Sequence, residues 1–222
     1  MARDGTKAAL YEQFARVGKA LSNPVRLELL DLLAQGERSV EDLADAAGMR
    51  LSNTSAQLKV LAQAGLLTTR RAGTRVFYRI ADTQVDALVG QVKDLARSRL
   101  ADVERAAHDY LGDVATLEPV SLNELSARTD AGDTVILDVR PAEEFRAAHI
   151  PGAINLPLDQ LATRLTDVPK DAHIVAYCRH RYCVLAPDAV RILREHGYDA
   201  RPLEGGIPEW RQAGFAVSAV AR

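Results

Sequence analysis

The spacing of apolar residues changes character about halfway along the 222-residue chain, and this change limits the folds that the chain can adopt. In the first half, apolar residues recur mostly every three or four positions, as they do on amphipathic helices. Beyond Pro119, short continuous apolar runs such as TVILDVR alternate with helical segments. This alternation is typical of a parallel sheet covered by helices on both faces. We therefore predict two domains of different classes, residues 1–112 and 119–222, with a linker at 113–118.

The first half begins with four helical segments, predicted over residues 6–21, 24–36, 39–48 and 52–65. Asn23 or Ser22 can cap the second helix, whose first turn suits Pro24. Ser39 with Asp42 three residues later is a near-capping box at the start of the third helix. The last two helices, joined by a short turn that contains glycine, fit a helix-turn-helix.

A β-hairpin is predicted next, from Leu66–Arg71 and Arg75–Ile80 around a turn of Ala72, Gly73 and Thr74. Helices followed by such a hairpin make a winged helix, a mainly α fold. One long helix is then predicted from Asp82 to about Tyr110, with an apolar stripe that must be buried somewhere. We expect this stripe and the first helix to form a homodimer interface.

The charge pattern points to one surface of this half. Between Ala46 and Ala81 there are six basic residues and no acidic one, although the whole chain has a net charge of −2. A window of one sign predicts a surface that faces a polyanion. In a helix-turn-helix the second helix enters the major groove of double-stranded DNA. The predicted DNA-contacting residues are Ser52, Asn53, Thr54, Ser55, Gln57, Lys59, Arg70, Arg71, Arg75 and Arg79. The plain alternative is a solvated basic face on which Ser52 or Asn53 only caps a helix.

Three segments, LSNPVRLELLDLL, LKVLAQAGLL and RRAGTRVFYRI, resemble ArsR/SmtB-type winged-helix repressors over roughly residues 8–100. The resemblance implies a homodimer on operator DNA that acts as a repressor and is released by an inducer. Metal-sensing members of that family carry cysteine pairs, or Asp and His ligands, at places where this chain offers only His108. One ligand is too few for a cation that needs about four, so no metal site is predicted. The winged helix therefore lacks a sensor of its own.

Both cysteines of the chain, Cys178 and Cys183, lie in the segment IVAYCRHRYCVLA. No start typical of a signal peptide and no apolar run long enough for a membrane helix is found, so we expect a cytoplasmic protein with no membrane partner. Cytosolic thiols are mostly kept reduced, which argues against a structural disulfide. Two thiols and the nearby His180 are too few for zinc. An apolar strand before the segment and a helix after it predict a loop that favours a thiolate or a bound anion.

The segments VILDVRPAEEFRAAHIPGAINLPLDQL, IVAYCRHRYCVLAPDAVRILREHGY and PLEGGIPEW are similar to a single rhodanese domain. The resemblance implies an α/β fold with a central parallel sheet, and a Cys178 that attacks the sulfane sulfur of thiosulfate or polysulfide and holds it as a persulfide. No cofactor is implied. The implied active loop consists of Cys178, Arg179, His180, Arg181, Tyr182 and Cys183. Asp138 and Arg140 are expected to support this loop, Trp210 to cap the core and His149 to hold a turn.

Two questions stay open at this point. In similar fusions the middle of the loop often reads Arg-Gly-Pro, whereas it is Arg179, His180 and Arg181 here, so the preferred sulfur donor is undetermined. Cys183 is either a small packing residue or a resolving thiol that forms a disulfide or polysulfide with Cys178.

We predict a DNA-binding transcriptional regulator whose rhodanese half senses or handles reactive sulfur through a persulfide on Cys178. The alternatives are a sulfurtransferase tethered to DNA and an arsenic- or metal-responsive repressor.

Overall fold

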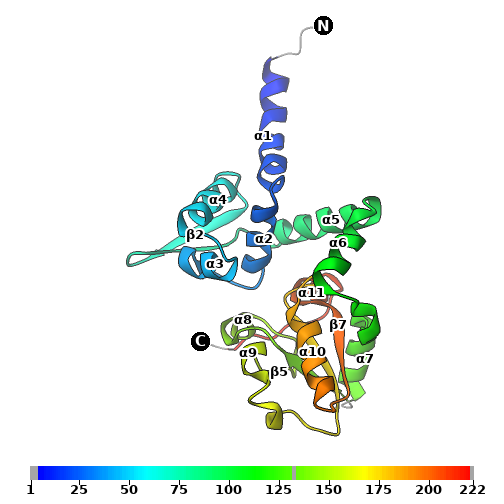
Figure 1. Ribbon diagram of the computed structural model, residues 1–222. Helices are drawn as coiled ribbons and strands as arrows, with labels where there is room; N and C mark the ends of the chain where they lie inside the picture. Colours follow the sequence, from blue (N-terminus) through cyan, green and yellow to red (C-terminus); the bar gives the residue numbers. More distant parts are fainter. Residues whose placement is uncertain (1–4, 132–133, 221–222) are drawn as a thin grey trace. The chain divides into compact units, whose positions relative to one another are not determined.

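The computed structural model describes residues 5–131 and 134–220, and the chain divides into two units between Val92 and Lys93. The predicted pair of folds is observed: a winged helix-turn-helix is followed by an α/β unit (Figure 1). The division lies earlier than residue 112, since the segment after Lys93 groups with the second unit. The boundary at 112 therefore stays a prediction about where an independent domain ends.

The first unit has a helical body and a small sheet. Its elements are α1 (Gly5–Leu21), α2 (Pro24–Leu33), β1 (Arg38–Ser39), α3 (Val40–Ala46), α4 (Leu51–Gln63), β2 (Leu67–Ala72), β3 (Arg75–Ile80) and the first part of α5 (Thr83–Arg99). The core consists mainly of leucines, among them Leu29, Leu30, Leu33, Leu43, Leu58, Leu61 and Leu66.

The helix starts in this unit follow local side-chain chemistry. Asn23 Oδ1 accepts a hydrogen bond from the amide of Arg26 at 3.2 Å, and Ser39 with Asp42 forms a complete capping box. Both predictions are confirmed, and each cap satisfies amides that the helix itself leaves without a partner. Helix α4 starts at Leu51 after an N-cap residue, Arg50, whose side chain makes no capping bond.

The predicted hairpin is confirmed, with a tighter turn than expected. Strands β2 and β3 are antiparallel, and Ala72 lies opposite Arg75, so the connecting loop has two residues rather than three. Gly73 opens this loop with φ of +61°, a conformation that glycine adopts without a steric penalty. Figure 1 shows the hairpin extending beyond α3 and α4. The two-residue strand β1, which pairs with β3, was not predicted because it is too short to leave a pattern.

The single helix predicted from Asp82 to Tyr110 is wrong, because the chain forms two helices there, α5 and α6 (Asp102–Leu111). Helix α5 ends with Arg97 and Arg99 in its last turn, and α6 begins with Asp102 in its first turn. Basic residues stabilise the carboxyl end of a helix and acidic residues the amino end. The charges thus mark a break that the apolar period does not reveal.

The second unit is built around a parallel sheet with the strand order β5-β4-β6-β7. Helix α7 was not predicted. The elements after α6 are η1 (Val114–Leu117), α7 (Leu122–Ala131), β4 (Thr134–Asp138), α8 (Ala142–Ala147), β5 (Ile154–Asn155), α9 (Leu158–Leu161), η2 (Leu165–Asp167), β6 (His173–Cys178), α10 (Leu185–Glu195), β7 (Ala200–Gly206) and α11 (Ile207–Gln212).

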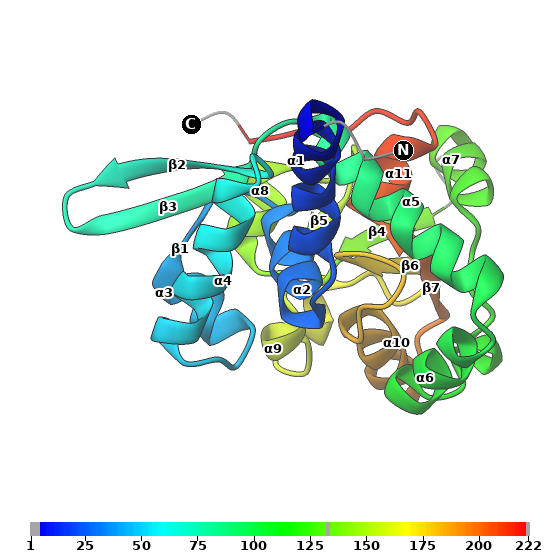
Figure 2. The same ribbon diagram turned by 90° about the horizontal axis from the view of Figure 1, so that it is seen from above.

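Alternate residues of the central strands enter two different cores, as the two-residue period of a strand requires. On β6, Val175 and Tyr177 pack with residues of α7 and α11, whereas Ala176 and Cys178 pack with residues of α9 and α10. Figure 2 shows α10 and α11 on opposite sides of these strands. Trp210, a residue of α11, is buried in the core on that side, as expected.

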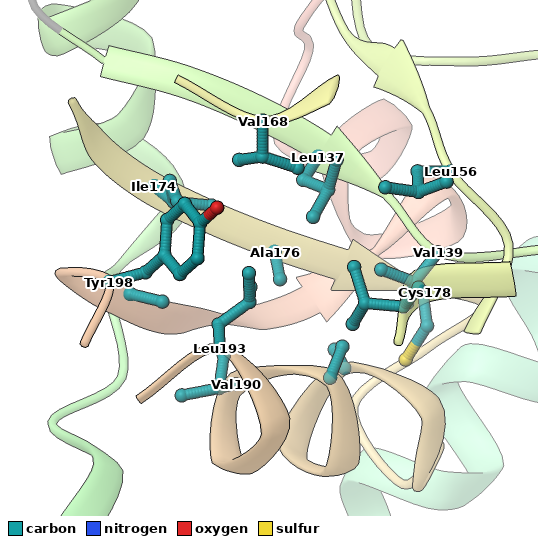
Figure 3. Close-up of a cluster of buried hydrophobic side chains, with 14 of the residues drawn as sticks. Leu137, Val139, Leu156, Val168, Ile174, Ala176, Cys178, Val190, Leu193 and Tyr198 are labelled. Atoms are coloured by element: carbon teal, nitrogen blue, oxygen red, sulfur yellow. The ribbon is translucent and has the colours of Figure 1, made fainter. Parts of the chain in front are cut away.

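The cysteine at the end of β6 belongs to the core on the α10 side. Figure 3 shows Cys178 at one end of that cluster, where β6 ends, and Tyr198 at the other end.

The backbone of His149 pairs with Ser218 in both directions, and its ring stacks on Phe145, in keeping with the structural role expected for it. None of the helices within residues 5–131 and 134–220 combines the length and apolar character needed to cross a bilayer.

Candidate functional site

The exposed face of α4 carries part of the predicted DNA-contacting set. Ser52, Asn53 and Lys59 are exposed, whereas Ser55 and Gln57 are half-buried. Gln57 Oε1 accepts a hydrogen bond from Arg26 Nη1 at 2.9 Å, so its side chain is held in place before any ligand arrives. These short polar groups on one helix face are the kind that read base edges and phosphates.

Thr54 must be removed from the predicted set. Its side chain is fully buried, and its hydroxyl donates to the carbonyl of Arg50 at 3.2 Å. Thr54 shares its face of α4 with Leu58 and Leu61, which follow at helical spacing and belong to the core. The helical spacing of Thr54 from Leu58 and Leu61 is the sequence signal for its buried position.

The hairpin presents the basic residues of the set. Arg71, Arg75 and Arg79 are exposed on β2 and β3. Arg70 is exposed too, but its Nε donates to Glu37 at 3.1 Å and its guanidinium lies 4.7 Å from the centre of the Phe77 ring. Glu37 therefore offsets part of the charge that Arg70 could offer to a phosphate.

The strand that leads to Cys178 is held by a buried polar network. Tyr177, the residue before Cys178, donates its hydroxyl to Asp138 Oδ2 at 2.5 Å. Arg140 donates to the same carboxylate at 2.6 Å and to the carbonyl of Ala148 at 2.7 Å. Asp138 and Arg140 are both fully buried, and burial raises the pKa of the Tyr177 phenol far above its usual range. Both residues thus lie behind the strand end, away from solvent.

Arg179, the second residue of the loop, is anchored by a carboxylate that was not among the predicted site residues. Arg179 donates from Nε to Glu144 Oε1 at 3.0 Å and from Nη2 to the same oxygen at 2.7 Å, and Glu144 is buried. Such a bonded guanidinium fixes the path of the loop. The Glu144 carboxylate also offsets part of the positive potential that Arg179 exerts on the sulfurs. Glu144 lies in the PAEEF part of the segment that resembles the rhodanese family. That position is the sequence feature that could have identified it as a site residue.

Three loop amides are used inside the loop's own scaffold. The amide of Arg181 donates to Glu209 Oε1 at 3.1 Å, that of Tyr182 to His180 Nδ1 at 3.2 Å, and that of Cys183 to the His180 carbonyl at 3.0 Å. In this arrangement Nδ1 of His180 acts as a hydrogen-bond acceptor. The loop is therefore a folded turn in which these three amides already have acceptors.

A glycine of the next strand allows the loop to lie close to it. A Cβ on Gly206 would lie 2.4 Å from the carbonyl oxygens of Cys178 and Arg179, far inside van der Waals contact. The amide of Gly206 donates to Glu209 Oε2 at 2.9 Å, so one carboxylate bonds to both the loop and the strand beneath it. Gly206 and Glu209 lie in the GGIPEW segment, but the sequence does not reveal their roles, because both act on loop residues that are distant in the chain.

The two sulfurs lie together at the amino end of α10, and both thiols are free and buried. The single S–H of Cys178 has two acceptors within reach, the Cys183 carbonyl oxygen at 3.4 Å and the Cys183 sulfur. Backbone amides of Arg179 and Ala186 donate toward Cys178, and those of Arg179 and Leu185 toward Cys183. Burial raises the pKa of Cys178 well above its usual value, whereas the hydrogen bond from the Cys178 thiol lowers the pKa of Cys183 to about 7. In this conformation Cys178 is therefore the less acidic thiol of the pair.

A cavity of about 410 Å³ in the second unit opens onto both cysteines. Its walls come from the loop, from the carboxyl half of strand β7 up to Gly205, and from α6. Within the described parts of the chain, no group of three or more His, Cys, Asp or Glu side chains is arranged to hold a metal ion.

The chain matches two families. Residues 21–70 match the helix-turn-helix domain family, and residues 121–213 match the rhodanese-like domain family. The HTH-type transcriptional regulator Rv0324 of Mycobacterium tuberculosis is 52% identical over 211 residues, which cover 95% of this chain and 92% of that protein. The thiosulfate sulfurtransferase GlpE of Shewanella oneidensis is 31% identical over 101 residues, 45% of this chain and 98% of that protein.

A solved structure is also similar to the first half. It is the homodimeric winged helix-turn-helix DNA-binding domain of a possible ArsR-family transcriptional regulator from Mycobacterium bovis, with 51% identity and a TM-score of 0.41, covering 45% of this chain and 93% of that chain. The match to the mycobacterial regulator, in contrast, spans both units. The chain therefore belongs to the ArsR-type winged helix-turn-helix transcriptional regulators, as a DNA-binding regulator with a carboxy-terminal rhodanese-like domain.

Proposed function

We propose that this regulator is a cytoplasmic homodimeric repressor that binds operator DNA through α4 and the hairpin β2–β3, and that sulfane sulfur carried on Cys178 weakens this binding. The observation that supports the proposal most is the pair of free, buried thiols at the amino end of α10. Amides of Arg179, Leu185 and Ala186 point toward the sulfurs. This arrangement stabilises an anionic sulfur, which is what a persulfide requires.

The pairing of the thiols suggests how the sulfur is taken up. The Cys183 thiolate accepts the proton of Cys178, and the Cys178 sulfur attacks the outer sulfur of a donor R–S–SH. A new S–S bond forms on Cys178 while the donor's S–S bond breaks, and the departing RS⁻ takes the proton back from Cys183. The products are a Cys178 persulfide and the thiol RSH, so no further oxidant or reductant is needed.

In this proposal Cys183 also acts as a resolving thiol after the persulfide has formed. Its thiolate can attack the inner sulfur of the Cys178 persulfide, form the Cys178–Cys183 disulfide and release HS⁻. The contact of Cys178 Sγ with the Cys183 carbonyl supports this step, since it shows that the loop is tightly curled. Either product would alter the packing at the start of α10.

Homodimer formation is supported by the surface of α1. Leu10, Tyr11 and Phe14 are 52%, 60% and 63% exposed, and they lie at helical spacing. Large apolar side chains gathered on one helix face mark an association surface. A second copy of the same face is the partner that a palindromic operator requires.

A route for the signal is supported by α5, which begins in the first unit and ends in the second. The Tyr182 phenol in the loop lies close enough to Arg97 of α5 and to Glu104 of α6 for their charges to act on its pKa, which burial raises. A loop that repacks around a persulfide would thus act on a helix shared by both units. An allosteric coupling of about 1–3 kcal/mol would suffice.

A second candidate is a sulfurtransferase that the DNA-binding unit only locates. It is supported by the similarity of residues in the second unit to a thiosulfate sulfurtransferase. Sulfur transfer to cyanide or to a thiol acceptor separates the two functions. High turnover that operator DNA leaves unchanged favours the enzyme, and single-turnover loading that changes DNA affinity favours the regulator.

The proposal is tested by treating the full-length protein with polysulfide and measuring two quantities on the same sample. Mass spectrometry of the loop peptide should show one or more added sulfur atoms on Cys178 or a bridge to Cys183. Operator affinity, measured by fluorescence anisotropy on DNA obtained by in vitro selection, should fall at least fivefold. Full modification with unchanged affinity would overturn the regulatory role.

A further inference from the structure

The cavity that opens onto the cysteines is not confined to the residues of the rhodanese-like match. That match covers residues 121–213, whereas Arg97, Glu104, His108 and Leu111 also line the cavity. Helix α6 has no buried residue, yet its carboxyl end is fixed, because Arg191 Nη2 donates to the carbonyl of Leu111 at 2.8 Å. Helix α6 therefore forms a positioned wall of the thiol cavity.

The size of the cavity sets the first limit on its ligand. Its volume of about 410 Å³ lies within the usual range of roughly 300–1,000 Å³ for pockets that take organic ligands. Inorganic donors such as thiosulfate are small anions that would leave most of this volume to water. A larger organic donor fills the space and displaces that water.

The charges of the cavity set the second limit. Arg97 and Arg181 contribute positive charge, and Glu104, Asp113 and Glu204 contribute negative charge. Arg97 also donates to Asp94 at 3.3 Å, an exposed pair that a ligand carboxylate can exchange with at little cost. Walls of one sign select a simple anion, whereas walls of both signs match a molecule that carries ammonium and carboxylate groups together. His108 adds a donor and acceptor on the α6 side.

We propose that the sulfur donor of Cys178 is a zwitterionic low-molecular-weight thiol persulfide, and that α6 supplies part of its binding site. The inference rests on the proposed function, since it names the donor of the same thiol. Arg97 pairs with a donor carboxylate and Glu104 with a donor ammonium group. The transfer itself is the one given above: the donor's S–S bond breaks, and the thiol RSH leaves.

Glutathione persulfide is a suitable probe, because one small molecule carries an ammonium group, carboxylates and a sulfane sulfur. Thiosulfate is the inorganic comparison. The rate at which the Cys178 peptide gains sulfur is measured in single turnovers at increasing donor concentration. We compare the full-length wild type with Arg97→Gln, Glu104→Gln and the control Asp109→Asn. Asp109 is exposed on the same helix but is not a residue of the cavity.

The wild type should be half-saturated by glutathione persulfide at a concentration at least tenfold lower than by thiosulfate. Arg97→Gln and Glu104→Gln should each raise that concentration for glutathione persulfide about tenfold, the usual weight of a hydrogen bond between charged groups. Asp109→Asn should match the wild type.

Half-saturation by thiosulfate at the same or a lower concentration would overturn the inference, and so would α6 variants that saturate like the wild type. In both cases Cys178 is still modified, so the proposed function stands. If neither donor adds sulfur to Cys178, the proposed function fails and the inference with it. Equal melting temperatures of the four proteins exclude misfolding as the cause of a difference.

Discussion

The two units of the chain use arginine in opposite ways. In the first unit, Arg71, Arg75 and Arg79 extend from the hairpin into solvent. In the second unit, Arg140 is fully buried against Asp138, and Arg179 is held by the buried Glu144. An exposed guanidinium offers its charge to a ligand, whereas a buried and bonded one fixes the position of the backbone around it.

The two units therefore differ in the source of the positive potential that they offer to an anion. The first unit acts through charge that a phosphate backbone can neutralise. In the second unit, much of the positive charge next to Cys178 is already taken up by Glu144, and backbone amides at the amino end of α10 stabilise the anionic sulfur. Counting basic residues therefore predicts a binding surface in the first unit, whereas in the second unit it overlooks the carboxylate that pairs with Arg179.

The sharpest test of this contrast compares two Arg–Glu pairs. Glu144→Gln removes the carboxylate partner of a largely buried Arg179, and should destabilise the second unit by about 3 kcal/mol. Glu37→Gln removes the partner of the exposed Arg70 and should leave the melting temperature almost unchanged. Denaturant unfolding followed by Trp210, the only tryptophan of the chain and a residue of the second unit, measures the first effect. Equal losses of stability in both variants would contradict the contrast.

Two glycines make the next comparison. Gly206→Ala should destabilise the second unit by about 2 kcal/mol and slow the loading of Cys178, because the new Cβ would meet loop carbonyl oxygens at 2.4 Å. Gly73→Ala meets no atom within 4 Å and bears only the penalty of a positive φ, about 1 kcal/mol. Trp210 fluorescence reports on the first variant and far-ultraviolet circular dichroism on the second. The account fails here if Gly206→Ala is as stable and as reactive as the wild type.

The pH dependence of sulfur loading tests the division of labour between the thiols. Since the pKa of Cys183 lies at about 7, its thiolate is available above pH 7 and is lost below it. The loading rate of Cys178 should therefore rise through pH 7 and level off. Cys183→Ala removes the proton acceptor, so the rate at pH 7 should fall about tenfold and the rise should move to higher pH, because burial raises the pKa of Cys178. Stopped-flow loading at a series of pH values measures both, and superimposable profiles would exclude Cys183 as the proton acceptor.

The smallest expected effects concern single hairpin residues. Arg71→Gln and Arg75→Gln should each weaken operator binding a few-fold and reduce the salt dependence of log K by about one. Arg70→Gln should do less, because Glu37 already offsets its charge. Anisotropy titrations at several salt concentrations provide the slopes. Equal slopes for all three variants would show that Glu37 does not restrain Arg70 on DNA.

Much of the fold could be predicted because its signals are local. Asn23 and Ser39 predict helix starts because their side chains cap the first turn, and Gly73 predicts the hairpin turn. The break between α5 and α6 was missed because the apolar period continues across it. Strand β1 pairs only through β3, a partner that lies far away in sequence.

The candidate site was predictable only in part. The place of Cys178 at a strand end follows from an apolar run and a family motif. The partners that shape the loop, Glu144 and Glu209, are 35 and 28 residues away from the loop residues that they contact. No periodicity reports which carboxylate reaches which donor, so the raised pKa of Cys178 and the lowered pKa of Cys183 could not be foreseen.

The most direct test of the central claim is the operator affinity of the wild type and of Cys178→Ser, each measured before and after polysulfide treatment. Before treatment, both proteins should bind the operator equally well, because Cys178 lies outside the DNA-binding unit. After treatment, the affinity of the wild type should fall at least fivefold, within the usual range of allosteric coupling, and that of Cys178→Ser should not change. An equal loss of affinity in both proteins would contradict the claim that sulfur on Cys178 controls DNA binding.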